Sequence, residues 1–176
     1  MRRMLTWLVS LAAAIVVTAR FAGDVLATDA GGFTGTTLAQ GRLGEIDVFN
    51  HLIQPNSPQS RHRRNTWLSW QKTKGMSDLY VQSNVWAPGG STGWHSHPGH
   101  SLIVVTAGTV TAYEGDDAEC RPHVYTQGMG FVDPGGDHVH ILRNEGSVEA
   151  RTVAVQLIPA AAARRIDAPD PGHCTF

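Results

Sequence analysis

The sequence lacks long runs of strong helix formers beyond its first 20 residues, and it carries little charge. Its 176 residues include 14 basic and 15 acidic side chains, 16% of the total, beside 19 glycines and nine prolines. Glycine and proline form turns and end strands, so this composition favours short strands over helices. With 41% hydrophobic residues, the chain suits one globular domain with an ordinary core. We therefore expect a single all-β domain.

The N-terminal apolar run is too short for a membrane-spanning helix, and residues 1–27 are instead typical of an export signal. Arg2 and Arg3 precede an apolar stretch at residues 5–17, and small residues follow. As a helix this stretch rises only about 20 Å, against a hydrocarbon core of about 30 Å. Cleavage is expected after Ala27 or Ala19, which makes the protein periplasmic or secreted. Retention as an N-terminal anchor stays open as the alternative.

The sequence also lacks a surplus of basic residues. Without the signal the chain is mildly acidic, so it has no electrostatic footprint for nucleic acid or anionic lipid. We therefore expect no nucleic-acid partner, and no membrane partner after cleavage.

Only two cysteines are present, Cys120 and Cys174, and neither has a CxxC partner. In an exported chain the simplest expectation is one disulfide that ties down the C-terminal tail. A thiolate ligand or redox site is the alternative.

After the signal, residues 28–42 are rich in glycine and threonine without apolar periodicity, which predicts an N-terminal arm. The barrel domain is expected over 43–160 and a turn-rich tail over 161–176. No internal repeat and no βαβ alternation appears. Short β-favouring segments between turn signals predict a sandwich or a closed barrel, and these segments are 45–52, 66–72, 79–86, 91–97, 102–114, 129–133, 138–144 and 151–158.

Histidine is concentrated in one region. Six of the nine histidines are His95, His97, His100, His123, His138 and His140. Side chains alternate faces along a strand, so His95 and His97 share a face, as do His138 and His140. Two such pairs on facing strands would form a site for Zn, Fe, Ni, Cu or Mn. Surface or hydrogen-bonded core histidines are the alternative, which two H-x-H pairs after Pro-Gly-Gly turns disfavour.

The first pair lies in the segment PGGSTGWHSHPGHSLIVVTAG, which resembles the first motif of the cupin family. In that motif a glycine is followed by H-x-H, a glutamate and a second glycine. Gly89, His95, His97 and Gly108 match this spacing, whereas Ser101 stands in place of the glutamate.

The second pair lies in GMGFVDPGGDHVHILRN, which resembles the second cupin motif. Matching positions are Gly128, Pro134, Gly136, His140 and Asn144, with one extra residue before His140. His138 is therefore an offset rival for the ligand position. Asp133 and Asp137 bracket the Pro-Gly-Gly turn, which accounts for them; a hydrogen bond from one of them to a ligand histidine is the alternative.

The resemblance covers about residues 80–158 and implies a single-domain double-stranded β-helix, or jelly-roll, barrel with a divalent metal on its inner face. Carried over position by position, His95, His97 and His140 are the metal ligands and the carboxylate is missing. His100 and His138 are further candidates. The ion is Fe, Zn, Mn or Ni.

The fold hosts many chemistries, so it does not specify the reaction. A three-histidine site favours an anionic small molecule, and the first hypothesis is an Fe-type dioxygenase or a related small-molecule enzyme. The second is a non-catalytic metal- or ligand-binding module, such as an exported sensor or storage barrel. The third is a purely structural barrel. Similar proteins commonly form homodimers, and no segment of this sequence demands one.

Overall fold

The computed structural model describes residues 27–54 and 65–176. The expected export signal, apart from Ala27, lies outside these residues. Within the described part of the chain, no helix has the length and apolarity needed to cross a membrane. The strands in chain order are β1 (Gly31–Leu43), β2 (Asp47–Gln54), β3 (Asn65–Lys72), β4 (Ser77–Ser91), β5 (His95–Ser96), β6 (Ser101–Ala107), β7 (Thr109–Glu114), β8 (His123–Thr126), β9 (Gly130–Asp133), β10 (His140–Arg143), β11 (Ala150–Pro159) and β12 (Ile166–Asp167).

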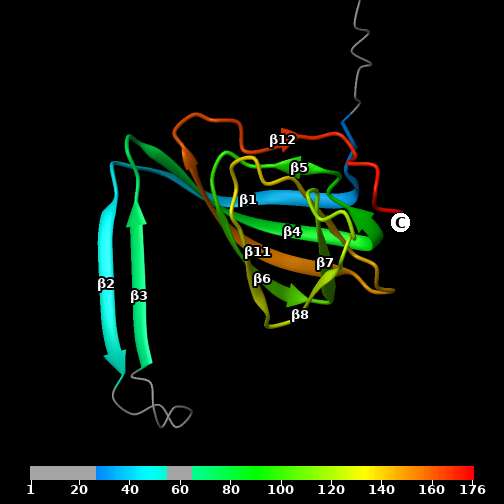
Figure 1. The fold of residues 1–176 in the computed structure, drawn as a ribbon, viewed down its shortest axis with the longest axis horizontal. Coiled ribbons are helices and arrows are strands. Elements are labelled where there is room, and N and C mark those ends of the chain that lie inside the picture. Colours follow the sequence, from blue (N-terminus) through cyan, green and yellow to red (C-terminus); the bar gives the residue numbers. More distant parts are fainter. Residues whose placement is uncertain (1–26, 55–64) are drawn as a thin grey trace, which may run out of the picture.

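Ten of these strands form a nearly closed antiparallel barrel (Figure 1). One run of paired strands is β1–β4–β11–β6–β9, and the other is β8–β7–β10–β5–β12. The runs join where Arg143 of β10 pairs with Ser91 at the end of β4. The prediction of an all-β, double-stranded β-helix is confirmed.

Side chains of β6 alternate between the interior of the barrel and its outer surface. In β6, Ser101, Ile103 and Val105 are buried, whereas Leu102 and Val104 are exposed. This period of two is what a strand with one face on a core requires. Alternate residues of β6 therefore line the barrel interior.

The core joins the two runs of strands. Trp86 of β4 and Ala150 of β11 pack against Val110 and Ala112 of β7 and Leu142 of β10. Trp86 is fully buried, and truncating a core tryptophan to alanine typically costs about 3–5 kcal/mol.

The segment predicted as an N-terminal arm is a strand. Residues Gly31–Leu43 form β1 and pair with β4 from Leu43 opposite Ser77 to Gly31 opposite Ser91. The segment lacks apolar periodicity because most of its side chains are exposed, with only Phe33 packed against the main core cluster. This edge strand is held by backbone pairing with β4. Because that pairing does not require apolar side chains, the polar sequence did not indicate a strand.

Three other strand boundaries differ from the expectations. The segment 102–114 is two strands, because Gly108 has φ +67° and a Cβ there would lie 2.6 Å from the Glu149 carbonyl oxygen. β8 and β12 were not expected. Both are short strands that depend on their partners, β7 and β5 respectively.

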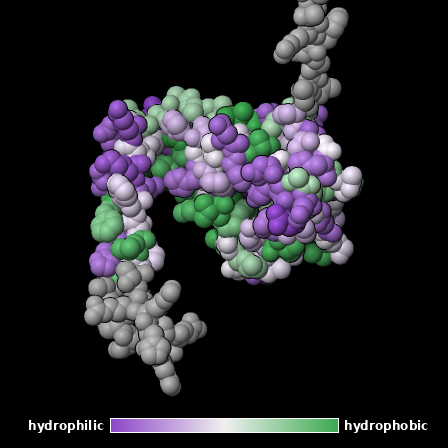
Figure 2. All heavy atoms as spheres, viewed as in Figure 1, coloured by the Kyte–Doolittle hydropathy of each residue, from purple (hydrophilic) through white to green (hydrophobic). Residues whose placement is uncertain are grey.

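β2 and β3 form a separate two-stranded sheet. This hairpin stands beside the barrel, with open space between them (Figures 1 and 2). It had been expected within the barrel domain. Its exposed apolar side chains, each 49–68% accessible, are Val48, Phe49, Leu52, Trp67, Leu68 and Trp70.

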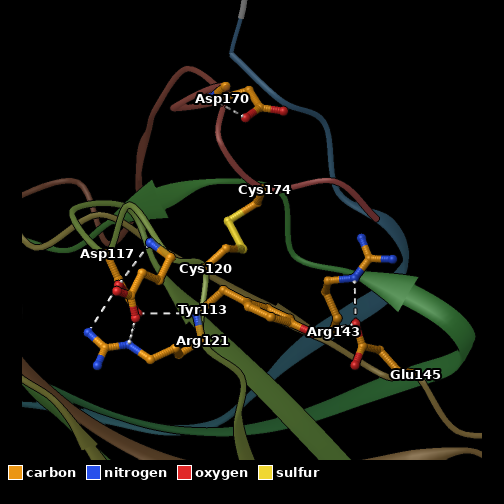
Figure 3. The surroundings of a disulfide bond; sticks show 10 residues. Tyr113, Asp117, Cys120, Arg121, Arg143, Glu145, Asp170 and Cys174 are labelled. Carbon is orange, nitrogen blue, oxygen red and sulfur yellow. Dashed lines mark hydrogen bonds and ion pairs between the residues drawn. A yellow bond between two sulfur atoms is a disulfide. The ribbon is translucent and has the colours of Figure 1, made fainter.

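The predicted disulfide is present between Cys120 and Cys174, whose Cα atoms are 5.4 Å apart across 54 residues of sequence (Figure 3). Cys174 packs with Trp94, Tyr113 and Ile141 in a second core cluster. Beyond it, the Phe176 ring lies 4.9 Å from that of Tyr113. The bond therefore fastens the tail to the loop between β7 and β8.

Breaking this bond should destabilise the fold. We expect reductant to lower the free energy of unfolding by about 2–4 kcal/mol, because the unfolded chain regains the freedom of a long loop. Guanidinium titration with and without reductant measures this loss. The matched control is Cys120→Ser/Cys174→Ser, which should unfold at the reduced midpoint under both conditions. An identical midpoint for the wild-type protein with and without reductant would contradict the prediction.

Candidate metal centre

Two short strands bring three histidines together. His140, the first residue of β10, pairs directly with His95 of β5. Directly opposed residues of an antiparallel pair share a face, and the two ring centroids are 4.5 Å apart. His97 follows β5, and its ring lies 4.8 Å from that of His95 and 5.5 Å from that of His140.

Backbone carbonyls orient all three imidazoles in the same way. Nδ1 of His95 lies 2.8 Å from the Gly93 oxygen, and Nδ1 of His97 lies 2.6 Å from the Arg164 oxygen. Nδ1 of His140 faces the His138 oxygen at 3.3 Å. Since a carbonyl only accepts, each Nδ1–H donates and each Nε2 keeps its lone pair.

The three rings are also arranged to converge. One ring nitrogen from each histidine lies within 4.8 Å of the others. Neutral nitrogen donors at this spacing, each fixed through its other nitrogen, suit Zn, Fe, Mn or Ni. The residues present therefore fit a divalent metal.

Burial keeps two of these imidazoles uncharged. Desolvation, with smaller contributions from the charges of His140, Arg165 and His97, lowers the pKa of His95 to about 2. Desolvation also lowers the pKa of His140 to about 4, although the Asp133 carboxylate partly opposes this. Both rings are neutral at pH 7, which is the form that binds metals.

The histidines line a cavity of about 220 Å³ inside the barrel. Apolar side chains such as Phe33, Trp86 and Ile103 form part of its wall. Arg164 and Arg165 from the tail also line it. The cavity wall therefore combines apolar side chains with two guanidinium groups.

The C-terminal tail builds one side of this site. β12 pairs with β5, with Asp167 opposite His95. The Arg164 carbonyl accepts from His97, and the Arg164 side chain donates to Gln156 at 3.1 Å. Sequence reasoning missed this contribution, since a backbone acceptor has no residue signature.

The other predicted candidates are not part of the cluster formed by His95, His97 and His140. His100 lines a different hollow, beside Lys72 and Pro159. His138 turns to Glu114, with its Nε2 2.9 Å from the carboxylate. His123 is exposed on β8. Ser101 is buried and does line the cavity.

Asp133, which the turn explained and for which contact with a ligand histidine was the alternative, lies beside the site. Its side chain is 4% exposed, and Oδ2 lies 3.4 Å from His97 Nε2. With His138 and His140 it also forms a second cluster of mutually close donor atoms. The signal for it lies in the register of β9 against β6, which sequence spacing does not show.

Comparisons with known proteins agree with this architecture. Residues 85–156 match the family model described as Cupin domain. Both histidine motifs lie within this stretch, and residues 85–156 are a cupin domain. No curated protein matches the sequence.

Similar solved structures include a protein with a double-stranded β-helix domain from Klebsiella pneumoniae, 22% identical over 51% of this chain and 74% of that one, with a TM-score of 0.43. The polyketide cyclase RemF from Streptomyces resistomycificus is 21% identical over 53% and 64% of the chains, with a TM-score of 0.43. An oxalate oxidase is 24% identical over 47% of this chain, with a TM-score of 0.39. The present chain spans about half, 46%, of that oxidase.

The buried neutral histidines predict acid sensitivity of the metal-free protein. Below the ordinary pKa of 6.5, the unfolded chain binds protons at His95 and His140, whereas the folded chain does so only near pH 2 and pH 4. The free energy of unfolding should therefore fall as pH drops from about 6.5 to about 4. Chemical denaturation in the presence of chelator measures this slope. His95→Gln should flatten it, and the exposed-site variant His123→Gln should not; equal slopes in all three proteins would refute the assignment.

Proposed function

We propose that the protein is a metal-binding cupin that acts on a small anionic molecule, most simply as an Fe-type dioxygenase or a related enzyme. His95, His97 and His140 would hold the divalent ion through Nε2. The observation that carries the proposal is the convergence of three imidazoles, two buried and one partly buried, whose Nδ1 atoms all face backbone carbonyls. When bound, the ion would supply Lewis-acid or redox chemistry.

The residues of the chain support an anionic substrate with an apolar body. Arg165 lines the cavity and has a side chain 30% exposed, paired with Asp167. A carboxylate or enolate could exchange for Asp167, since a guanidinium binds such groups bidentately. Phe33, Trp86 and Leu142 form an apolar wall, which would exclude water around the rest of the molecule.

Arg164 has a different role in this proposal. Its side chain donates to Gln156 and Thr37 and to Gln82, and its guanidinium lies 4.2 Å over the Tyr80 ring. These contacts hold the tail against β1, β4 and β11. In this proposal Arg164 therefore positions the backbone carbonyl that orients His97 and does not bind the substrate.

Loss of any one histidine should collapse the metal content. His95→Ala, His97→Ala and His140→Ala each remove one of three nitrogen donors, and we expect at least a tenfold fall in bound metal by elemental analysis of protein purified without chelators. His123→Ala is the matched control and should retain the wild-type content. His138→Ala tests the register of the second motif. If it lost the metal while His140→Ala kept it, the assignment of His140 would be wrong.

A non-catalytic metal- or ligand-binding module is the second candidate, favoured by Ser101 at the place of the motif glutamate. Oxygen consumption by iron-loaded protein with small diketones, thiols and phenols separates the two. Turnover that the His95→Ala variant abolishes supports the enzyme. Metal binding without turnover of any of these classes supports the binding module.

We also propose export, with which the disulfide is compatible.

We further propose a homodimer in which the β2–β3 hairpin of one copy covers part of a second copy. Phe49 is directly opposite Trp70, so both lie on one exposed face of the hairpin. An isolated hairpin is only marginally stable in water, and exposed apolar faces mark interfaces. On the barrel, Leu102 is directly opposite Val132, and both are exposed.

A single charge should break this dimer. We expect Trp70→Lys to elute at the monomer mass in size exclusion with light scattering, because burying an unpaired ammonium in an apolar contact is costly. Val148→Lys, at another exposed apolar position, is the control and should stay dimeric. A monomeric wild-type protein would rule out the homodimer.

A further inference from the structure

A carboxylate lies directly across the sheet from the position where the first motif has its glutamate. Ser101 of β6 pairs with Asp133 of β9. Directly opposed residues of antiparallel strands share a face, and here that face is the cavity wall, since both residues line the cavity and both are buried. The negative charge that is absent at Ser101 is therefore present at Asp133, on the neighbouring strand.

One oxygen of this carboxylate is fixed by the turn that follows it. Asp133 Oδ1 accepts a hydrogen bond from the Gly135 N–H at 3.0 Å. Gly135 has φ +70°, and a Cβ there would collide with the Gly99 backbone. This close packing sets the second Pro-Gly-Gly turn against the loop after His97, which directs Oδ2 toward the histidines.

The other oxygen, Asp133 Oδ2, is buried and has no hydrogen-bond partner among the residues that the structure describes. It lies 3.4 Å from His97 Nε2. His97 Nδ1 faces the Arg164 carbonyl, so in the neutral ring the lone pair is on Nε2, the atom that faces Oδ2. A buried carboxylate oxygen without a partner destabilises the metal-free fold. A cation between the two atoms would satisfy both.

We propose that Asp133 is the carboxylate ligand of this metal site and replaces, from the facing strand, the glutamate that Ser101 lacks. The inference rests on the proposed metal site. Its donor set becomes three nitrogens and one oxygen, and the net charge of the bound divalent ion falls from +2 to +1. An octahedral ion would keep two open positions, enough for one bidentate anionic ligand.

This assignment differs from a positioning role for the same residue. Asp133 Oδ1 is 3.8 Å from His140 Nδ1, beyond hydrogen-bond length, and that nitrogen already faces the His138 carbonyl at 3.3 Å. Orientation of His140 therefore does not depend on Asp133. The charge and the free Oδ2 are what Asp133 adds to the site.

The test uses Asp133→Asn in the full chain. Asparagine keeps the acceptor for the Gly135 N–H and loses the charge, so the turn is preserved. We expect the Kd for Zn²⁺, measured by competition with a chromophoric chelator, to rise at least tenfold. The visible spectrum of Co²⁺-loaded protein should also change, since it reports the donor set directly. Asp137→Asn, an exposed carboxylate four residues away, is the matched control and should leave both unchanged.

A transfer experiment separates ligation from a structural effect. In Ser101→Glu/Asp133→Asn the carboxylate returns to the motif position, and we expect Zn²⁺ affinity to recover to within about threefold of the wild type. If this variant misfolds by near-ultraviolet circular dichroism, the Co²⁺ spectrum of Asp133→Asn alone decides the question. An unchanged Kd and an unchanged Co²⁺ spectrum in Asp133→Asn would overturn the role of Asp133. A wild-type protein that binds no metal, or a His95→Ala variant that binds as well as the wild type, would instead overturn the metal site itself.

Discussion

The pairing of β5 with β10 at His95 and His140 is the constraint on which the site depends. β5 is only two residues long, so it cannot hold its position alone. It lies between β10 and β12, and β12 belongs to the tail that the Cys120–Cys174 bond fastens. The disulfide, far from the histidines in sequence, thus stabilises the strand that carries the first of them.

Burial of neutral imidazoles links stability to function. The pKa values of His95 and His140 are lowered because the barrel interior disfavours charge, and the same burial prepares both rings to bind a cation without first losing a proton. The metal-free chain carries this arrangement at a cost, which includes the unpaired oxygen of Asp133. A bound ion would offset that cost, since it binds only the folded state.

Much of the fold followed from short sequence patterns, and the rest depended on pairing. Two H-x-H pairs after glycine turns predicted that distant histidines would meet, and the structure brings His95, His97 and His140 together while turning His138 toward Glu114. β1 was not predicted, because its exposed residues show no apolar periodicity. The Pro-Gly-Gly turn was a sufficient explanation for Asp133 in the sequence, because only the register of β9 against β6 places this residue beside His97.

The most direct test of the account is the location of the metal. Crystals of protein loaded with Zn²⁺, measured with X-rays above and below the zinc edge, should give an anomalous peak inside the barrel. We predict it at about 2.0–2.1 Å from Nε2 of His95, His97 and His140. A barrel without such a peak, or a zinc ion bound only at an exposed histidine such as His123, would contradict it.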